Sequence, residues 1–432
     1  MQPAAAPSRK TNRLTNLIML GLVLGIAAGY ACNQLAGNAD QAKTIASYFS
    51  VVTDIFLRLI RMIIAPLVFA TIVSGIASLG HSGGSVGRIA GKALLWFLCA
   101  SLISIGLGLI FANLLAPGAG LGLPLPDAKA TTNLATSSLN VKDFAAHVFP
   151  TSAVQAMASN EVLQILVFAV FFGFALTQLK PETTRTITAA VGELVHVMLR
   201  ITDMVMKFAP VGVFAAMAAV ITTQGLGVLV TYGKFIGSFY IALIVLWIVL
   251  FGAGTAVLGR ASVTLLRLLR EPMLIAFSTA SSEAAFPKMI EQTVKFGVRE
   301  RVAGFVMPLG YSFNLDGSMI YQAFASLFIA QAYGIEMSFG QQITMLLVMM
   351  VTSKGIAGVP RAGLVVVAAI LPMFNLPTGG VVLILGIDQF LDMGRTMTNV
   401  IGNGFATAVV AKWEGELAPA AETEDAAALA AG

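Results

Sequence analysis

The sequence predicts an all-α integral membrane protein, and three observations indicate this fold class. Of the 432 residues, 57% are hydrophobic and only 11% are charged, whereas soluble domains carry about 25% charged residues. The mean hydropathy is +0.86, which indicates lipid as the main solvent. Apolar segments long enough to cross a bilayer recur along the chain. These observations exclude an ordinary soluble domain and a disordered chain.

Charged and metal-binding residues are too few and too scattered for several other classes of function. The net charge is +5, but Lys and Arg fall in every second connection between apolar segments, which is typical of cytoplasmic loops and not of nucleic-acid binding. Two cysteines, Cys32 and Cys99, lie in apolar stretches and offer neither a disulfide framework nor a zinc site. Three histidines do not favour a metalloenzyme. We expect a multi-pass protein of the cell (inner) membrane, with both termini cytoplasmic and no nucleic-acid partner.

The N-terminal half contains a series of predicted membrane helices. Residues 1–13 are polar and basic, and we expect them to lie in the cytoplasm. The run Leu14–Cys32 is longer than a signal-peptide core of about 7–15 residues, so it predicts an uncleaved first transmembrane helix. The Thr- and Ser-rich stretch Pro117–Met157 predicts an extracytoplasmic or periplasmic loop, and 415–432 a disordered tail. The other apolar segments are Ala46–Leu79, Ala93–Ala116, Glu161–Gln178, Ile187–Thr222 and Phe235–Leu258.

Two segments of the C-terminal half predict re-entrant hairpins. Glu271–Pro287 is too short and too polar to span a bilayer, and basic residues flank it on both sides, so we expect it to enter and leave by one face with a Ser-rich tip. In Gln341–Leu371, glycines, a proline and two charges interrupt the apolar sequence. Irregular backbone at membrane depth is tolerated only where protein or a watery cavity covers it, and paired broken segments mark transporter binding sites. The alternative is two ordinary helices, each with a glycine kink.

The last apolar segment, Gly386–Trp413, carries a stripe of polar residues spaced to lie on one face of an α-helix. Each intramembrane charge costs at least about 2.5–3.5 kcal/mol, so the stripe needs partners. It predicts a ligand site, and the alternative is an internal Asp392–Arg395 salt bridge that joins helices. A second polar break, Gly310–Ser318, predicts an unwound helix whose oxygens face a cation. The stripe residues are Asp388, Asp392, Arg395, Thr396, Asn399 and Asn403.

Four motifs are together specific for one known family. They are Thr279–Glu283, Asn314–Gly317, Ser353–Gly355 with Val359-Pro360, and Asp392–Thr396 with Asn399. With them, nearly the whole chain resembles the dicarboxylate/amino acid:cation symporters, relatives of the glutamate transporters, and looks closest to bacterial proton/sodium–glutamate/aspartate symporters. The resemblance implies eight transmembrane helices and two re-entrant hairpins in a homotrimer that works by elevator movement. Residues 14–260 would hold helices 1–6, of which helices 1, 2, 4 and 5 would form the scaffold for trimerisation. Residues 261–414 would form the transport core, with both hairpins and helices 7 and 8, and helices 3 and 6 would move with this core.

The resemblance also implies how a substrate binds. Arg395 would pair with the substrate's side-chain carboxylate, and Asp392 would hold its ammonium group. Because dicarboxylate members of the family lack an acid at the position of Asp392, the resemblance favours import of L-glutamate or L-aspartate, with a C4-dicarboxylate:cation symporter of the same fold as the alternative. A membrane enzyme would need a nucleophile–base pair, and a channel would need a continuous polar pore, so both are disfavoured. The implied substrate-binding residues are Ser281, Ser282, Ser318, Val359, Gly363, Asp392, Arg395, Thr396 and Asn399.

The coupling ion is predicted from the residues near the stripe. No phosphate-binding loop is present in the sequence, which favours secondary symport over an ATP-driven pump. Sodium-coupled members place an Asp where Asn403 stands, and a Tyr and a Thr where Phe97 and Ala100 stand. We therefore expect H+ to replace some or all of the Na+, with no other cofactor. Expected proton carriers are Glu283, Asp316 and Asp388, the candidate Na+ ligands are Asn314, Asp316 and Asn399, and the further coupling residues are Gly310, Ser312, Ser353, Asn403 and Ser101.

Overall fold

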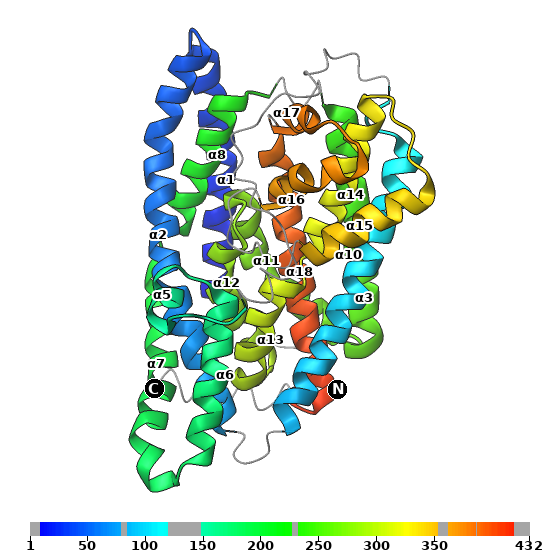
Figure 1. Ribbon diagram of the computed structural model, residues 1–432. Coiled ribbons are helices and arrows are strands. Elements are labelled where there is room, and N and C mark those ends of the chain that lie inside the picture. Colours follow the sequence, from blue (N-terminus) through cyan, green and yellow to red (C-terminus); the bar gives the residue numbers. More distant parts are fainter. Residues whose placement is uncertain are drawn as a thin grey trace.

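The protein is a bundle of helices in the computed structural model (Figure 1). Within the residues that the structure describes, the one β-type pairing is an isolated bridge between Val298 and Leu417. The all-α class predicted from the sequence is therefore confirmed for those residues. The described ranges are 9–78, 84–119, 148–226, 232–352, 362–385 and 387–418.

Helices long and apolar enough to cross a membrane dominate the N-terminal half. Among the described residues four stretches qualify by length and composition, and α7 and α8, which meet at a bend of 53°, add a fifth when counted as one span. A multi-pass membrane protein is thus supported, while eight spans stay a prediction. The helices are α1 (Arg9–Leu35), α2 (Ala39–Ser78), α3 (Gly84–Leu115), α5 (Ala153–Ala158), α6 (Val162–Gln178), α7 (Pro181–Met206), α8 (Ala209–Gln224) and α10 (Gly233–Leu258).

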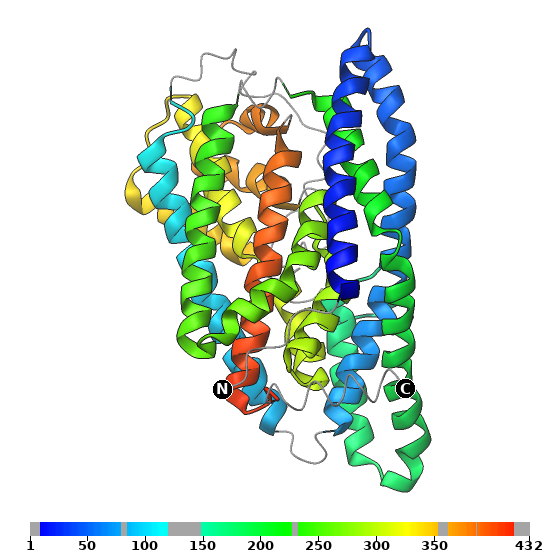
Figure 2. The same ribbon diagram turned by 180° about the vertical axis from the view of Figure 1, so that it is seen from behind.

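Glycines on α1 determine how closely it packs on α8. Gly21, Gly25 and Gly29 recur every four residues, and a side chain on any of them would collide with the backbone of α8. Small residues at this spacing let membrane helices approach closely. In both views α1 and α2 stand at one side of the bundle, and α3 and α10 stand at the other (Figure 2).

The first predicted hairpin is present as two helices packed on each other, α11 (Ala261–Thr279) and α12 (Ser282–Phe296). The chain reverses at Ala280, which has a φ of 48°, and at Ser281. The Ser281 hydroxyl caps α12 by accepting a hydrogen bond from the Ala284 amide at 3.3 Å. Because a serine cap satisfies an otherwise unpaired amide, the Ser-rich sequence explains why the chain turns here.

The remaining elements include the second polar break, as predicted, and two helices at the place of the second predicted hairpin. A helix that begins at Glu300 stops at Phe313 and restarts at Asp316, so the Gly310–Ser318 segment is broken as predicted. Helices α15 and α16 pack against each other, while the tip between them, with Ser353 and Val359, lies outside the described residues. These elements are α13 (Glu300–Phe313), α14 (Asp316–Ala332), α15 (Phe339–Thr352), α16 (Ala362–Ile370), the 3-10 turns η2 (Leu371–Phe374) and η3 (Thr378–Gly380), α17 (Val381–Leu385) and α18 (Asp388–Glu414).

Helix α18 lies at the centre of the C-terminal half, in contact with α3, α10, α11, α12, α13 and α14 (Figure 1). Its glycines allow this enclosure: a side chain at Gly394 would strike Tyr240 of α10, and one at Gly404 would strike Leu269 of α11. The sequence pattern of α18 places a polar stripe among apolar faces, and the surrounding helices bury most residues of these faces between Asp388 and Ala411. The stripe therefore faces protein and not lipid.

Candidate functional site

The polar stripe of α18 is buried along its whole length. No member exposes more than 8% of its surface, although the stripe contains three charged groups. Burial at this level requires partners for each charge, since an uncompensated ion in a dry interior costs several kcal/mol. The following contacts show which partners each side chain has.

Arg395 and Asp392 form an ion pair within α18. The Arg395 Nε and Nη2 atoms lie 2.8 Å and 2.7 Å from Asp392 Oδ1. Thr396 donates to the same oxygen at 2.8 Å. The salt bridge considered as an alternative is thus present, but it does not occupy the whole guanidinium group, because Nη1 has no hydrogen-bond partner among the described residues. A buried N–H without an acceptor favours an anionic ligand at this point.

Tyr321 of α14 connects Arg395 with Asp388. Its hydroxyl donates to Asp388 Oδ1 at 2.5 Å, and the Arg395 guanidinium carbon lies 5.0 Å from the centre of its ring. Gly363 of α16 lies against the same pair, since a Cβ there would collide with Arg395 Nη1 and with the Tyr321 ring. The second hairpin thus contacts the guanidinium group directly. A cation over an aromatic face gains electrostatic attraction, which holds the group in place.

Tyr321 is a site residue that sequence reasoning missed. It lies three residues after Ser318, which places both on one face of α14, so helical spacing would have found it.

Asn399 links the stripe to the broken helix. Its Oδ1 accepts from the Gly317 amide at 2.9 Å, and its Nδ2 donates to the Ser318 hydroxyl at 3.4 Å. The tip serines of the first hairpin, Ser281 and Ser282, are half-buried. No contact between those two hydroxyls and Arg395 occurs among the hydrogen bonds of the described residues. The structure therefore joins Ser318 of the broken helix to Asn399 of the stripe, whereas the described hydrogen bonds do not join the hairpin serines to the stripe.

The predicted coupling residues meet where α13 ends. Asn314 donates through Nδ2 to Asn403 Oδ1 at 3.1 Å, and its own Oδ1 has no hydrogen-bond partner among the described residues. Asp316, which is fully buried, lies against Gly402, because a Cβ on that glycine would strike its Oδ2. Gly310 lies against Asn403 in the same way. Four residues from α13, the break after it, α14 and α18 thus lie together, and each has an oxygen atom of the kind that hard cations bind.

Three further expected coupling residues are Ser312, Ser101 and Glu283. Ser312 and Ser101 are each 1% exposed, and the Ser312 hydroxyl has no hydrogen-bond partner among the described residues. Glu283, at the start of α12, pairs with Arg61 Nε of α2 at 3.1 Å and not with the stripe. The sequence contained no signal for this pair, because its partners are 222 residues apart.

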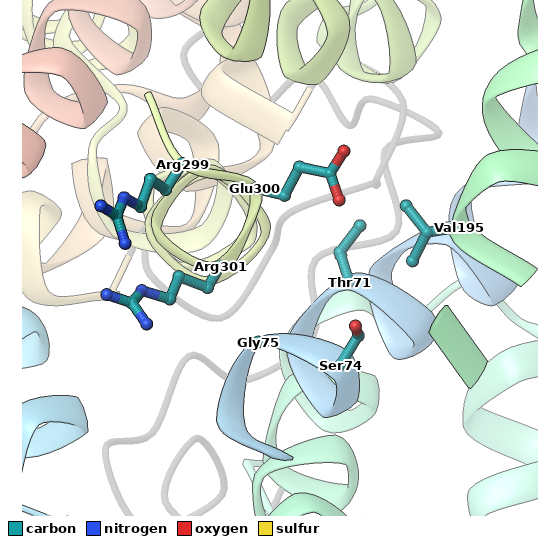
Figure 3. A pocket seen from close by; sticks show the side chains of 7 residues that line it. All are labelled: Thr71, Ser74, Gly75, Val195, Arg299, Glu300 and Arg301. Atoms are coloured by element: carbon teal, nitrogen blue, oxygen red, sulfur yellow. The ribbon is translucent and has the colours of Figure 1, made fainter. Parts of the chain in front are cut away.

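A cavity of about 280 Å³ lies between α2, α7 and the start of α13, away from the stripe. Figure 3 shows Glu300 extending toward Val195, whereas the guanidinium groups of Arg299 and Arg301 point away from α2. Both arginines are engaged by Glu416, with Arg299 Nε at 3.3 Å from its Oε2. Both guanidinium groups are thus paired with a carboxylate and turned away from the side of the cavity that Glu300 faces, so the cavity does not favour an anionic substrate.

The buried stripe, the broken helix and the paired hairpin arms form one arrangement, and residues 14–413 match the sodium:dicarboxylate symporter family. The chain belongs to this family. Its members' description and the names of its relatives indicate a transporter and not an enzyme. The predicted membership of the dicarboxylate/amino acid:cation symporters is thus confirmed.

Several relatives in the family share about two-fifths of their residues with this chain. A C4-dicarboxylate transport protein 2 of Polaromonas naphthalenivorans is 43% identical over 370 residues, which cover 84% of this chain and 82% of the relative. A C4-dicarboxylate transport protein of Agrobacterium fabrum is 42% identical over 84% of this chain and 82% of its own length. A third, from Rhodospirillum rubrum, is 38% identical over 96% of this chain and 92% of its own length.

Proposed function

We propose that this protein is a secondary symporter that imports a C4-dicarboxylate together with cations. The observation that carries the proposal is the buried Arg395 guanidinium group, whose Nη1 has no hydrogen-bond partner among the described residues. One substrate carboxylate would accept from this nitrogen. The substrate class follows from the relatives, whose names state C4-dicarboxylate transport. These names favour the dicarboxylate over the acidic amino acid that the resemblance had favoured.

An acidic amino acid remains the second candidate because of Asp392. This carboxylate lies within the site, at 2.7 Å from Arg395 Nη2, and would attract a substrate ammonium group. A dicarboxylate has no such group, but it does not meet a bare negative charge either, because Arg395 and Thr396 already donate to Asp392 Oδ1. The Asp392–Arg395 pair has no net charge, so Asp392 by itself does not exclude a dicarboxylate.

Cation coupling, with H+ alone or with Na+, completes the proposal. Asn403 stands where a carboxylate would supply charge, and its amide oxygen accepts a hydrogen bond from the Asn314 amide. An amide pair attracts a metal cation less strongly than a carboxylate does, so it supports a larger share for protons. We further propose movement of the substrate site across an inner membrane by alternating access, with a homotrimer as the assembly.

Uptake into proteoliposomes tests the substrate class. Radiolabelled succinate, L-aspartate and L-glutamate are offered separately under an inward proton gradient, an inward sodium gradient or both. Uptake of succinate that excess L-glutamate does not inhibit would support the dicarboxylate, and accumulation of the amino acids alone would refute it. Accumulation driven by sodium at constant pH, with no response to a proton gradient, would refute proton coupling.

Two variants separate the roles of the ion pair. Arg395→Ala is expected to reduce uptake of either substrate about 10–100-fold, because a hydrogen bond to a charged group contributes roughly 1.5–3 kcal/mol. Arg395→Lys is the matched control, which keeps the charge but loses the planar fork of donors. If the substrate is a dicarboxylate, Asp392→Asn is expected to spare succinate uptake. If the substrate is an acidic amino acid, the same variant is expected to abolish L-aspartate uptake. Full activity of Arg395→Ala would contradict the proposed binding mode.

A further inference from the structure

A second buried group of charges lies apart from the stripe, around Lys288 of α12. The Lys288 Nζ atom is 2.7 Å from Glu291 Oε2, 3.5 Å from Glu271 Oε1 and 4.0 Å from Asp203 Oδ1. Glu271 belongs to α11, and Asp203 belongs to α7. We call these four residues the Lys288 cluster. It joins the two arms of the first hairpin to a helix outside the hairpin.

Within the Lys288 cluster, Glu271 is the most deeply buried residue, and its carboxylate is poorly hydrogen-bonded. It is 1% exposed, and neither of its carboxylate oxygens has a hydrogen-bond partner among the described residues. Lys288 donates to both oxygens of Glu291, at 3.0 Å and 2.7 Å. Its distance of 3.5 Å from Glu271 is longer than the roughly 2.7–2.9 Å of a charge-assisted hydrogen bond. The side-chain oxygen of Gln292, also 1% exposed, lacks a donor too.

The Lys288 cluster therefore carries more negative than positive charge, and Glu271 lies farther from Lys288 than a charge-assisted hydrogen bond allows. Three carboxylates surround one ammonium group, and the Asp203 and Glu291 side chains, 47% and 30% exposed, can be solvated by water whereas Glu271 cannot. Lys295 on α12 also acts on Glu271 electrostatically. A buried ion pair that served only to join helices would be fully hydrogen-bonded, because an unsatisfied buried carboxylate is costly.

A proton supplies the missing charge better than a metal ion does. Among the described residues, no group of three or more His, Cys, Asp or Glu side chains is arranged to hold a metal ion. The ammonium group of Lys288 would also repel a metal cation at this distance. A proton, in contrast, needs only one carboxylate oxygen and converts it into a donor.

We propose that Glu271 is a proton-binding site of the transporter, separate from the substrate site and from the Asn314–Asn403 region. Glu271 is thus a further proton carrier beside those expected near the stripe. This inference rests on the proposed function as a cation symporter. Protonation removes one of the three negative charges around Lys288, which then interacts with Glu291 and Asp203 alone. Because Asp203 lies on α7, proton binding alters the attraction between the first hairpin and that helix.

The pH dependence of uptake tests this site. Glu271→Gln keeps the shape of the side chain but cannot bind the proton, and Glu291→Gln is the matched control from the same cluster. Initial rates of succinate and L-aspartate uptake are measured in proteoliposomes from acidic to alkaline external pH. Wild-type rates are expected to rise on acidification by up to about tenfold per pH unit, the limit for one proton. Glu271→Gln is expected to keep the acidic rate with a flattened profile. Glu291→Gln is expected to keep the slope of the profile but to move its midpoint to more acidic pH, because a neighbouring negative charge is lost.

A spectroscopic measurement keeps the inference testable without transport. Infrared difference spectra of the purified protein between acidic and alkaline pH are expected to contain a protonated-carboxyl band that Glu271→Gln removes. Lys288→Met is expected to move the midpoint of that band to more alkaline pH, because the neighbouring positive charge is lost. If neither substrate is transported but the band behaves as expected, the proposed function fails and the proton site stands. A wild-type pH profile in Glu271→Gln, an unchanged band, or an unmoved midpoint would overturn the site.

Discussion

Gly402→Ala is expected to weaken cation-coupled uptake while leaving the protein folded. The added methyl group would occupy the space of Asp316 Oδ2 and would lie 3.2 Å from Asn314 Nδ2. Overpacking a core costs about 1–3 kcal/mol, and replacing a helical glycine by alanine returns roughly 0.5–1 kcal/mol. The net loss of stability is therefore roughly 0–2.5 kcal/mol. Displacement of the Asp316 carboxylate is expected to lower the affinity for cations clearly, whereas this loss of stability leaves the protein folded.

Gly404→Ala is the matched control for that substitution. It lies on the same helix, and the three atoms nearest to its methyl group would be side-chain carbons of Leu269, with Cδ2 at 2.9 Å. We therefore expect a similar change in thermal stability but an unchanged response to cations. The assay is initial uptake against proton and sodium concentration for both variants, together with their melting temperatures. A wild-type cation response in Gly402→Ala, at wild-type protein level, would refute the placing of Asp316 and Asn314 in the coupling site.

Three further substitutions test single contacts. Tyr321→Phe removes the buried hydroxyl that donates to Asp388 at 2.5 Å, and we expect a loss of about 1–3 kcal/mol, measured by thermal unfolding. Asn403→Asp adds charge beside Asn314 and is expected to increase the sodium dependence of uptake; a sodium response equal to wild type would argue against this. Ser281→Ala removes the cap of α12 and is expected to cost about 1 kcal/mol, with melting temperature as the readout and Ser282→Ala as the control.

The sequence was sufficient for features that repeat along one helix or interrupt it. The stripe was predictable because Asp388 to Asn403 follow the helical period, and burial of polar residues in a membrane chain requires that they face protein. The break at Asn314 was predictable because Asn, Asp and Gly in an apolar segment do not sustain a helix. Ser281 was predictable as part of a tip, although its role as a cap became clear only with the α11–α12 turn.

Contacts between distant segments were not predictable, because no local pattern encodes them. The Tyr321–Asp388 hydrogen bond joins residues 67 apart in the sequence, and Arg61 and Glu283 are 222 apart. Glu271 was named only as the first residue of a polar segment, and its isolation from donors depends on where three helices place their side chains. The substrate class was also beyond local patterns, since Asp392 alone favoured an amino acid while the relatives are named for dicarboxylates.

The charges of a dicarboxylate make a proton site outside the substrate site physically useful. Arg395 and Thr396 both donate to Asp392, and the opposite charges of Asp392 and Arg395 cancel, so this pair adds no net charge to a bound substrate. Importing two negative charges against a membrane potential of 100 mV costs about 5 kcal/mol, twice the cost of one charge. At least two cations must therefore accompany the substrate before the potential stops opposing entry, and a third would make it favourable. Glu271 lies outside the Asp392–Arg395 pair, and its distance of 3.5 Å from Lys288 is longer than the 2.7 Å between Asp392 and Arg395, so it is held less tightly by its cationic partner.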